Sequence, residues 1–238
     1  MKRIATLLLA LGIFAAASTA AVAQLTDEMR RDGWVSIFNG TSLEGWKPND
    51  TANNAGVFKA ENGNIVGTGG RQHLYYMGEE FRNFELKIDV KINNDGNSGV
   101  YVKSQWQDNN WPTTGFELQV NSSHGDPQKS GTLYNIVKIH KAPHGDDEWF
   151  TYHIICRGNE MEVRINDVHL YTYVDQNRAP AGGARAGQGG GQGGGQATTP
   201  PAITEATKRI SQSGYIALQQ HHQGSVVEFK NIFVKKLP

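Results

Sequence analysis

The sequence predicts an antiparallel β-sandwich, a two-sheet jelly roll with very little helix. Residues 84–92 (FELKIDVKI) alternate apolar and polar side chains along their whole length, which is the pattern of a strand buried on one face. Further short segments behave similarly and recur at roughly 8–15-residue spacing, as in sandwiches and jelly rolls. These segments span residues 57–59, 65–67, 99–104, 115–120, 151–156, 161–165, 214–219 and 226–234.

Turn-forming residues separate these segments. Asn93–Gly96 (NNDG), Arg157–Asn159 (RGN) and the pair Asn166–Asp167 each follow an apolar run. Glu61–Asn64 (ENGN) lies between two short strand patterns and predicts a tight hairpin, because Asn-Gly accepts the left-handed backbone of such turns. Only residues 26–32 and 203–210 are helix candidates.

Two segments lie outside the predicted fold. Residues 1–23 combine Lys2 and Arg3, an apolar run and an Ala-Val-Ala ending, which predicts a signal peptide cleaved after Ala23 and a periplasmic or secreted protein. Residues 177–202 are rich in Gly and Gln, so we expect a disordered insertion within one domain that covers residues 33–237. After cleavage no long apolar span remains, and we expect no membrane association.

Composition excludes several function classes. Lys+Arg and Asp+Glu both number 23, so there is no basic excess of the kind that nucleic-acid binding requires. The single cysteine, Cys156, excludes an internal disulfide and is predicted to be a buried small apolar residue. The sequence contains no Gly-x-Ser-x-Gly elbow, no phosphate-binding glycine loop before a helix and no His-Glu-x-x-His motif.

Polar side chains on three strand segments suggest a carbohydrate site. If the apolar residues of each segment face the core, their polar neighbours share the opposite face. Such a face could bind a polyhydroxylated ring, with an aromatic side chain for stacking. The alternative is that it is an ordinary solvated sheet face. The polar set is Tyr101, Lys103, Gln105, Glu117, Gln119, Asn121, Gln219 and His221, and the stacking candidates are Tyr101, Trp106 and Trp111.

Candidate acids and bases follow the same strands. His124 and Asp126 could form a proton relay or bind a hard cation, although their spacing is no metal signature and a structural loop is the simpler reading. Glu117 has Gln119 and Asn121 as its polar neighbours along the strand, whereas a retaining glycosidase needs a second carboxylate about 5–5.5 Å away.

Several motifs together resemble the 3-keto-disaccharide hydrolase domain family. They span about residues 33–237 and are WVSIFNG at 34–40, LEGW at 43–46, NSGVYV at 97–102, GFELQ at 115–119, GTLY at 131–134, IALQQH at 216–221 and VEFKNI at 227–232. The resemblance implies a concanavalin A-like, laminarinase-like jelly roll. It also implies cleavage of glycosides oxidised at carbon 3 by a secreted or periplasmic enzyme. The family usually has Asp where this chain has Asn121, and Arg where it has Lys103.

The implied chemistry explains the missing carboxylate. A 3-keto group makes the C2 proton acidic, and its loss allows the glycosidic oxygen to leave C1, so one base, an oxyanion stabiliser and an acid suffice. We expect Glu117 or His124 as the base and His221 as the acid. Lys103, Gln119 or a divalent cation would stabilise the enolate; the sequence requires no metal or other cofactor and identifies no metal ligands. The remaining candidates, Tyr101, Gln105, Trp106, Asn121 and Gln219, would bind the sugar.

Two alternatives remain open. A non-catalytic carbohydrate-binding module of the same fold needs only the aromatic and amide groups. An ordinary glycosidase would need a second carboxylate near Glu117, for which Asp126, Asp108 and Glu228 are the candidates.

Overall fold

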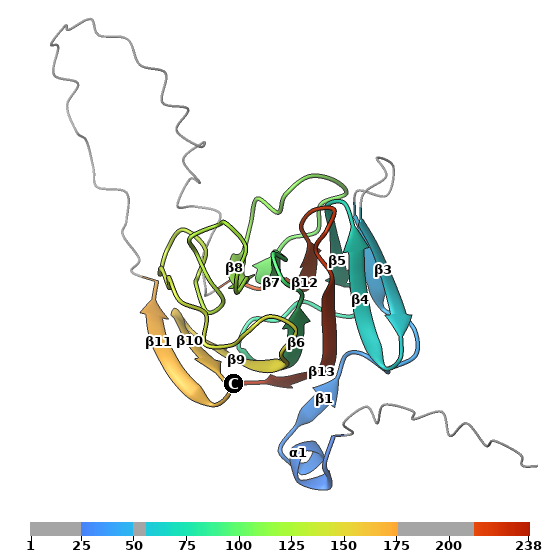
Figure 1. Cartoon of the computed structure of the whole chain (residues 1–238). Helices are drawn as coiled ribbons and strands as arrows, with labels where there is room; N and C mark the ends of the chain where they lie inside the picture. The colour runs from blue at the N-terminus through green and yellow to red at the C-terminus, as the bar shows by residue number, and fades with distance from the viewer. Residues whose placement is uncertain (1–24, 50–55, 176–211) are drawn as a thin grey trace, which may run out of the picture.

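A computed structural model describes residues 25–49, 56–175 and 212–238, which contain one short helix and two antiparallel sheets (Figure 1). The predicted signal peptide, the predicted helix at 203–210 and the predicted disordered insertion at 177–202 lie outside these residues. The elements are α1 (Asp27–Arg31), β1 (Trp34–Ser36), β2 (Trp46–Pro48), β3 (Gly56–Glu61), β4 (Asn64–Gly69), β5 (Gln72–Tyr76), β6 (Phe84–Ile92), β7 (Ser98–Ser104), β8 (Phe116–Val120), β9 (Phe150–Arg157), β10 (Glu160–Ile165), β11 (Val168–Val174), β12 (Tyr215–Gln220) and β13 (Val227–Lys236).

The two sheets form the predicted sandwich. The larger sheet has the strand order β11-β10-β9-β6-β13-β4-β3, with β1 also paired to β13, and the smaller sheet has the order β2-β5-β12-β7-β8. Apolar side chains from the inner faces of both sheets make one core, which includes Ile88, Val100 and Leu218, all fully buried. Cys156 is buried in this core as predicted, and burial raises the pKa of its thiol to about 12.

Local sequence accounts for most of these elements. Thr26 caps α1 by accepting a hydrogen bond from the backbone N–H of Met29 at 3.1 Å, which confirms the first helix candidate. The predicted hairpin joins β3 to β4, with Asn62 and Gly63 both at positive φ, the backbone that a two-residue turn requires. The strands β1, β2, β5 and β11 were not among the predicted segments, because β1 and β2 are very short and β5 and β11 lack a regular alternation of polar side chains.

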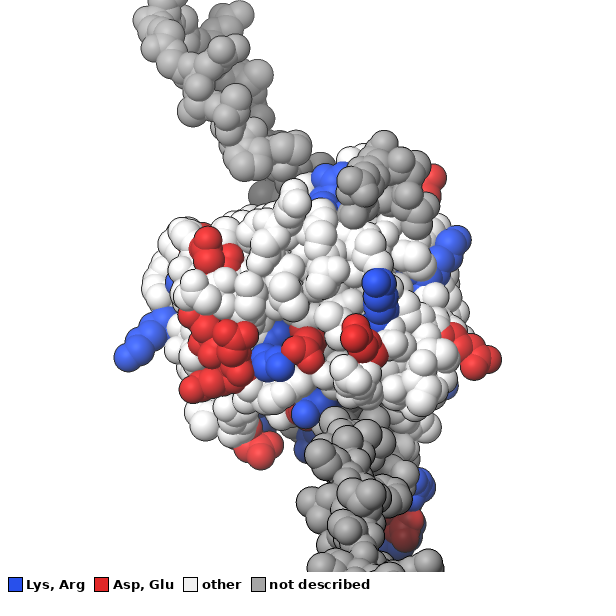
Figure 2. Space-filling view, turned by 45° about the vertical axis from the view of Figure 1, so that its right-hand side comes forward, with Lys and Arg blue, Asp and Glu red and all other residues white. Residues whose placement is uncertain are grey.

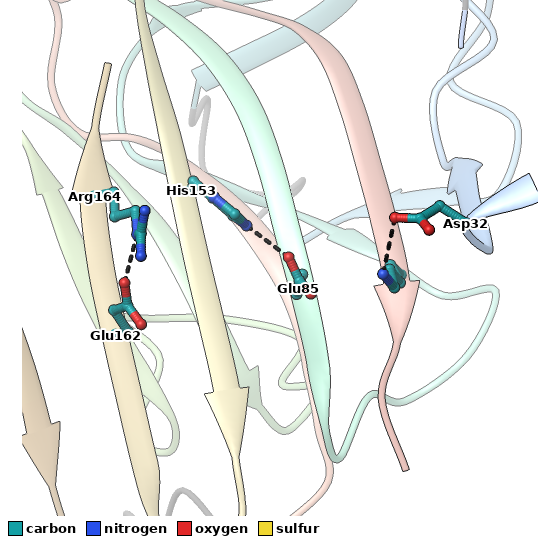
Figure 3. Close-up of polar contacts among 6 residues, drawn as sticks. Asp32, Glu85, His153, Glu162 and Arg164 are labelled. Atoms are coloured by element: carbon teal, nitrogen blue, oxygen red, sulfur yellow. Dashed lines mark hydrogen bonds and ion pairs between the residues drawn. The ribbon is translucent and has the colours of Figure 1, made fainter. Parts of the chain in front are cut away.

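The outward face of the eight-stranded sheet carries a His–Glu hydrogen bond and ion pairs. His153 on β9 lies 2.9 Å from Glu85 on β6, and Lys235 on β13 lies 3.1 Å from Asp32, which follows α1 (Figure 3). Arg164 and Glu162 pair along β10 in the same view. Figure 2 shows a face on which acidic side chains gather at one side, with lysines and arginines among and around them.

Burial patterns distinguish the two sheets. Along β6 buried residues alternate regularly with half-buried ones, as expected for a sheet with one solvated face. Along β7 every residue is buried. The outward face of the five-stranded sheet is therefore covered, and the loops between β7 and β8 and between β8 and β9 lie beside that sheet in Figure 1.

Candidate functional site

Strand register places polar residues in rows across the outward face of the five-stranded sheet. Ala217 on β12 lies opposite Tyr75 on β5 and Tyr101 on β7, and Tyr101 in turn lies opposite Glu117 on β8. In the next row, Gln219 lies opposite His73, and Gly99 lies opposite Gln119. The predicted shared face of Tyr101, Glu117, Gln119 and Gln219 is thus present.

Glu117 is the centre of a hydrogen-bonded group on this face. Its Oε2 accepts a 2.8 Å hydrogen bond from the Tyr101 hydroxyl, and its Oε1 accepts one of 3.1 Å from the Gln219 amide. The same amide nitrogen lies 3.2 Å from the Tyr101 oxygen. Burial, followed by the Glu117 charge, raises the pKa of Tyr101 well above its usual value, so the phenol stays protonated and keeps donating.

Gly99 makes room for the Glu117 side chain. A Cβ atom at this position would lie 2.6 Å from Glu117 Oε1 and 3.0 Å from its Cγ. Any other residue would push the carboxylate out of its hydrogen-bonded position. The space that the Glu117 side chain occupies therefore explains why the third residue of the Asn-Ser-Gly motif is a glycine.

A cavity of about 300 Å³ opens above these residues. Its floor is the five-stranded sheet, and its walls come from the loops that follow β7, β8 and β12. The lining residues are Asn97, Tyr101, Trp111, Pro112, Glu117, Gln119, Asp126, Tyr134, Asn135, Gln219 and His221. The volume is at the lower end of the range for small-molecule sites.

Several lining groups are buried without a hydrogen-bond partner among the described residues. They are both polar atoms of the Gln119 side chain, Oδ1 of Asn97 and Oε1 of Gln219. Buried polar groups are nearly always satisfied in folded proteins, and a group left without a partner costs about 1–3 kcal/mol. Such a concentration around one cavity indicates a site prepared for a polar ligand.

A second carboxylate reaches the cavity from the loop after β8. The Tyr134 hydroxyl donates a 3.0 Å hydrogen bond to Asp126 Oδ2. Burial and this hydrogen bond raise the pKa of Tyr134 to about 12, so it is a protonated phenol at neutral pH. The strand neighbours of Glu117 are amides as predicted, but Asp126 supplies the cavity with another acidic group.

Three imidazoles cluster beside the cavity, and His221 is the one among its lining residues. The rings of His221 and His222 have centroids 5.3 Å apart, and the His124 ring lies 6.1 Å from that of His221. Burial and the neighbouring imidazoles lower the pKa of His221 to about 4. His221 is therefore neutral at pH 7, whereas the acid role predicted from the sequence is best filled by a protonated imidazole. His124 does not line the cavity, and its Nδ1 lies 3.2 Å from the Asn97 amide nitrogen.

Asn121 shapes the loop that carries His124 and Asp126. Its amide nitrogen donates to the carbonyl oxygens of Asp126 and Gln128 at 3.1 and 3.0 Å, and its side-chain oxygen accepts from Lys129 at 3.3 Å. An aspartate could not make the two donations. An asparagine at this position, where the resemblance implies Asp, thus has a structural explanation, and Asn121 lies beside the cavity rather than lining it.

Lys103, Gln105 and Trp106 lie away from the cavity, which differs from the prediction. The pairing of β7 with β12 shifts register beyond Tyr101, and Lys103 has a φ of 62°. Strict alternation therefore ends there, and the Lys103 ammonium donates to the Arg82 carbonyl oxygen near the Phe84 ring. The Gln105 amide donates to the Ser213 carbonyl at 3.1 Å, and the Trp106 ring packs on Tyr75 under the Lys47 ammonium.

Trp111 supplies the exposed aromatic surface instead. It is 39% exposed and lines the cavity beside His221, whose ring centroid is 5.0 Å away. It was one of the stacking candidates, whereas the functional interpretation of the sequence gave no role to Asn97, Tyr134 and Asn135. The motifs NSGVYV and GTLY contain Asn97 and Tyr134, and these motifs were the sequence features that could have identified the two residues as part of the site.

The described residues lack the features of two further classes of site. They contain no group of three or more His, Cys, Asp or Glu side chains that could hold a metal ion. Across the same ranges, no helix has the length and apolar character needed to cross a membrane.

The chain is similar to a family and to solved structures whose names refer to carbohydrates. The family model described as "3-keto-alpha-glucoside-1,2-lyase-like domain" matches residues 33–235. A candidate glycosyl hydrolase from Parabacteroides distasonis ATCC 8503 has 24% identity and a TM-score of 0.71, with 92% of this chain and 100% of that chain covered. None of the curated proteins compared with the chain matches it.

Two other solved structures share the sandwich. A second candidate glycosyl hydrolase from Parabacteroides distasonis ATCC 8503 has 21% identity and a TM-score of 0.62, covering 86% of this chain and 99% of that one. The carbohydrate-binding module CBM66 from Bacillus subtilis has 10% identity and a TM-score of 0.52, with 81% and 96% covered. At these identities the likeness concerns the fold, and it confirms the jelly-roll prediction.

Proposed function

The chain belongs to the 3-keto-alpha-glucoside-1,2-lyase-like domain family, and we propose that it cleaves the glycosidic bond of 3-keto-glycosides in the cavity above Glu117. The observation that carries this proposal is the Tyr101–Glu117–Gln219 group, a positioned carboxylate at the floor of a cavity lined by unpartnered amides. We also propose that the protein acts after export, because residues 1–23 have the pattern of a signal peptide.

Glu117 is the proposed base. It removes the proton from C2, and the electrons of the C2–H bond form an enolate with the C3 carbonyl. The Gln119 amide, which has no other hydrogen-bond partner among the described residues, then donates to the enolate oxygen. When the enolate collapses, a C1=C2 double bond forms, the C1–O bond breaks, and the electron pair leaves with the glycosidic oxygen.

Tyr134 is the proposed proton source for the leaving oxygen. It is protonated at neutral pH and lies on the loop wall, whereas Glu117 lies on the sheet floor. Its single proton, which Asp126 accepts in the structure, turns to the glycosidic oxygen when substrate is bound and transfers to it as the C1–O bond breaks. The products are a free alcohol and a 2-hydroxy-3-keto-glycal, and addition of water to the glycal completes a net hydrolysis. Neutral His221 would accept a hydrogen bond from a sugar hydroxyl.

An isotope experiment tests the reaction type. Methyl 3-keto-α-glucoside, its 2-deuterated form and unoxidised methyl α-glucoside are incubated with the mature protein, with and without a chelator. We expect cleavage of the keto substrate only, an ultraviolet band from the conjugated product, and slower reaction of the deuterated form because its C2–H bond must break. The chelator arm shows directly whether a divalent cation takes part.

Two results would overturn the proposal in favour of a specific alternative. Binding of these sugars without cleavage of any of them would identify a carbohydrate-binding module. Cleavage of the unoxidised glucoside, lost in Asp126→Asn, would identify an ordinary glycosidase that uses the second carboxylate of the cavity.

A further inference from the structure

His73 is a buried imidazole directly behind the aromatic wall of the cavity. It is fully buried, and neither of its ring nitrogens has a hydrogen-bond partner among the described residues. Its ring meets Tyr101 and Trp111 edge-on, at centroid distances of 5.3 and 5.5 Å. Burial, followed by the charge of Arg71 and the neighbouring His221 imidazole, lowers the pKa of His73 to about 3. At neutral pH the ring is thus uncharged, with one N–H donor and one acceptor.

Gln219 presents the complementary unpartnered group. It lies opposite His73 in the register of β5 and β12, so both side chains project from the same face. Its amide nitrogen is used by Tyr101 and Glu117, whereas its Oε1 is buried without a partner among the described residues. A buried donor and a buried acceptor therefore stand at directly opposed positions of adjacent strands, each lacking what the other offers.

We propose that His73 is a positioning residue that acts through Gln219. In the working site the His73 N–H donates to Gln219 Oε1, which completes a chain from His73 through the Gln219 amide to Glu117. The two residues are cross-strand neighbours, so the proposed bond joins directly opposed side chains and would form by rotation of a side chain. This series of hydrogen bonds fixes which end of the Gln219 amide faces Glu117, and it thereby holds the carboxylate in its orientation.

The retention of an imidazole at this position supports this role. A phenylalanine could pack against Tyr101 and Trp111 without burying two unpartnered nitrogens, and such nitrogens cost free energy of folding. Polar groups kept in a protein interior at such a cost require an explanation, and a hydrogen bond made during function supplies one. This inference rests on the proposed role of Glu117, although the contact between His73 and Gln219 can be tested without it.

The first test is a double-mutant cycle on activity, with methyl 3-keto-α-glucoside as the substrate. His73→Phe keeps an aromatic ring but removes the donor, so we expect kcat to fall about 10-fold while KM changes less than about twofold. In a Gln219→Ala background the same substitution should have no further effect, because its route to Glu117 is already absent. His73→Gln, which restores an amide donor, should recover part of the lost kcat. A folded His73→Phe protein with wild-type kcat, or losses that simply add, would overturn the proposal.

The second test needs no substrate. Thermal unfolding of wild type, His73→Phe, Gln219→Ala and the double variant gives the coupling between the two side chains. We expect the two single effects on Tm not to add, because either substitution alone removes the hydrogen bond between His73 and Gln219. Additive effects would show that the residues do not interact. If the wild type cleaves no 3-keto-glycoside but this coupling is found, the proposed function fails and the contact between His73 and Gln219 stands. If His73→Phe does not fold, His73→Gln replaces it in both cycles.

Discussion

The outward faces of the two sheets use polar residues in opposite ways. On the eight-stranded sheet, polar groups pair with one another, as in the His153–Glu85 hydrogen bond and the Lys91–Glu228 ion pair. On the five-stranded sheet, loops cover the face, and the polar side-chain atoms of Gln119 and His73 are buried without hydrogen-bond partners among the described residues. Satisfied polar groups at a surface serve solubility and stability, whereas unsatisfied ones around a cavity indicate a ligand site. Position in a sandwich alone would not have distinguished the two faces.

The largest expected effect on activity comes from comparing one glutamate on each face, Glu117 and Glu85. Glu117→Gln should lower kcat/KM on a 3-keto-glucoside by about 10³-fold, because the proposed base is lost while the shape of the side chain is kept. Glu85→Gln is the matched control, since Glu85 lies on the eight-stranded sheet and pairs with His153. Its steady-state kinetics should equal those of wild type. A Glu117→Gln enzyme with more than a tenth of wild-type activity would remove Glu117 from the role of base.

A smaller effect comes from filling the space beside Glu117. In Gly99→Ala the new Cβ would lie 2.6 Å from Glu117 Oε1, so the carboxylate must move and activity should fall about 100-fold. Gly125→Ala is the control, because nothing lies within 4 Å of its Cβ position. Kinetic assays of both variants, with circular dichroism to confirm folding, would decide. Equal activity of the two would show that the position of Glu117 is not critical.

Trp111 should affect binding more than stability. Because the ring is 39% exposed and lines the cavity, Trp111→Ala should raise KM about 10-fold through lost stacking, with little change in Tm. Trp149, which lies beneath Lys230 at 3.9 Å, is the control. Calorimetric titration with the keto sugar measures both variants. An unchanged affinity in Trp111→Ala would exclude stacking on this ring.

Acid should destabilise the protein through its buried neutral imidazoles. The pKa of His73 is lowered to about 3 and that of His221 to about 4, so the unfolded chain takes up protons first as pH falls below 6.5. Each group then costs up to about 1.4 kcal/mol of stability per pH unit, until the pH reaches its folded-state pKa. Denaturant unfolding at pH 7.5, 5.5 and 4.5 measures the slope. His73→Phe should reduce it, and an unchanged slope would mean that His73 is not buried in the neutral form.

The smallest effect concerns an ion pair of the other face. Arg164→Ala removes the partner of Glu162 on β10, and because both side chains are partly exposed the cost should be below about 1 kcal/mol. Activity should not change. Chemical denaturation and the kinetic assay together test this, and a clear loss of activity would contradict the assignment of function to the five-stranded sheet alone.

The sequence by itself determined the sandwich and much of the site. Alternation fixed β6 over the predicted residues, since one buried face and one solvated face leave a period-two pattern. It also placed Tyr101, Glu117, Gln119 and Gln219 on one face, because side chains alternate along every regular strand.

Only the tertiary structure decided the rest. The irregularity in β7 turned Lys103 away from Tyr101, and no local pattern records where a strand departs from regular geometry. Loops brought Asp126 and Tyr134 to the cavity of Glu117 and buried His73 behind it, since contacts between distant segments depend on how the sheets and loops pack. Charge states followed from that packing. His221 is neutral because it is buried beside two further imidazoles, and the position of His221 in the sequence does not reveal these surroundings.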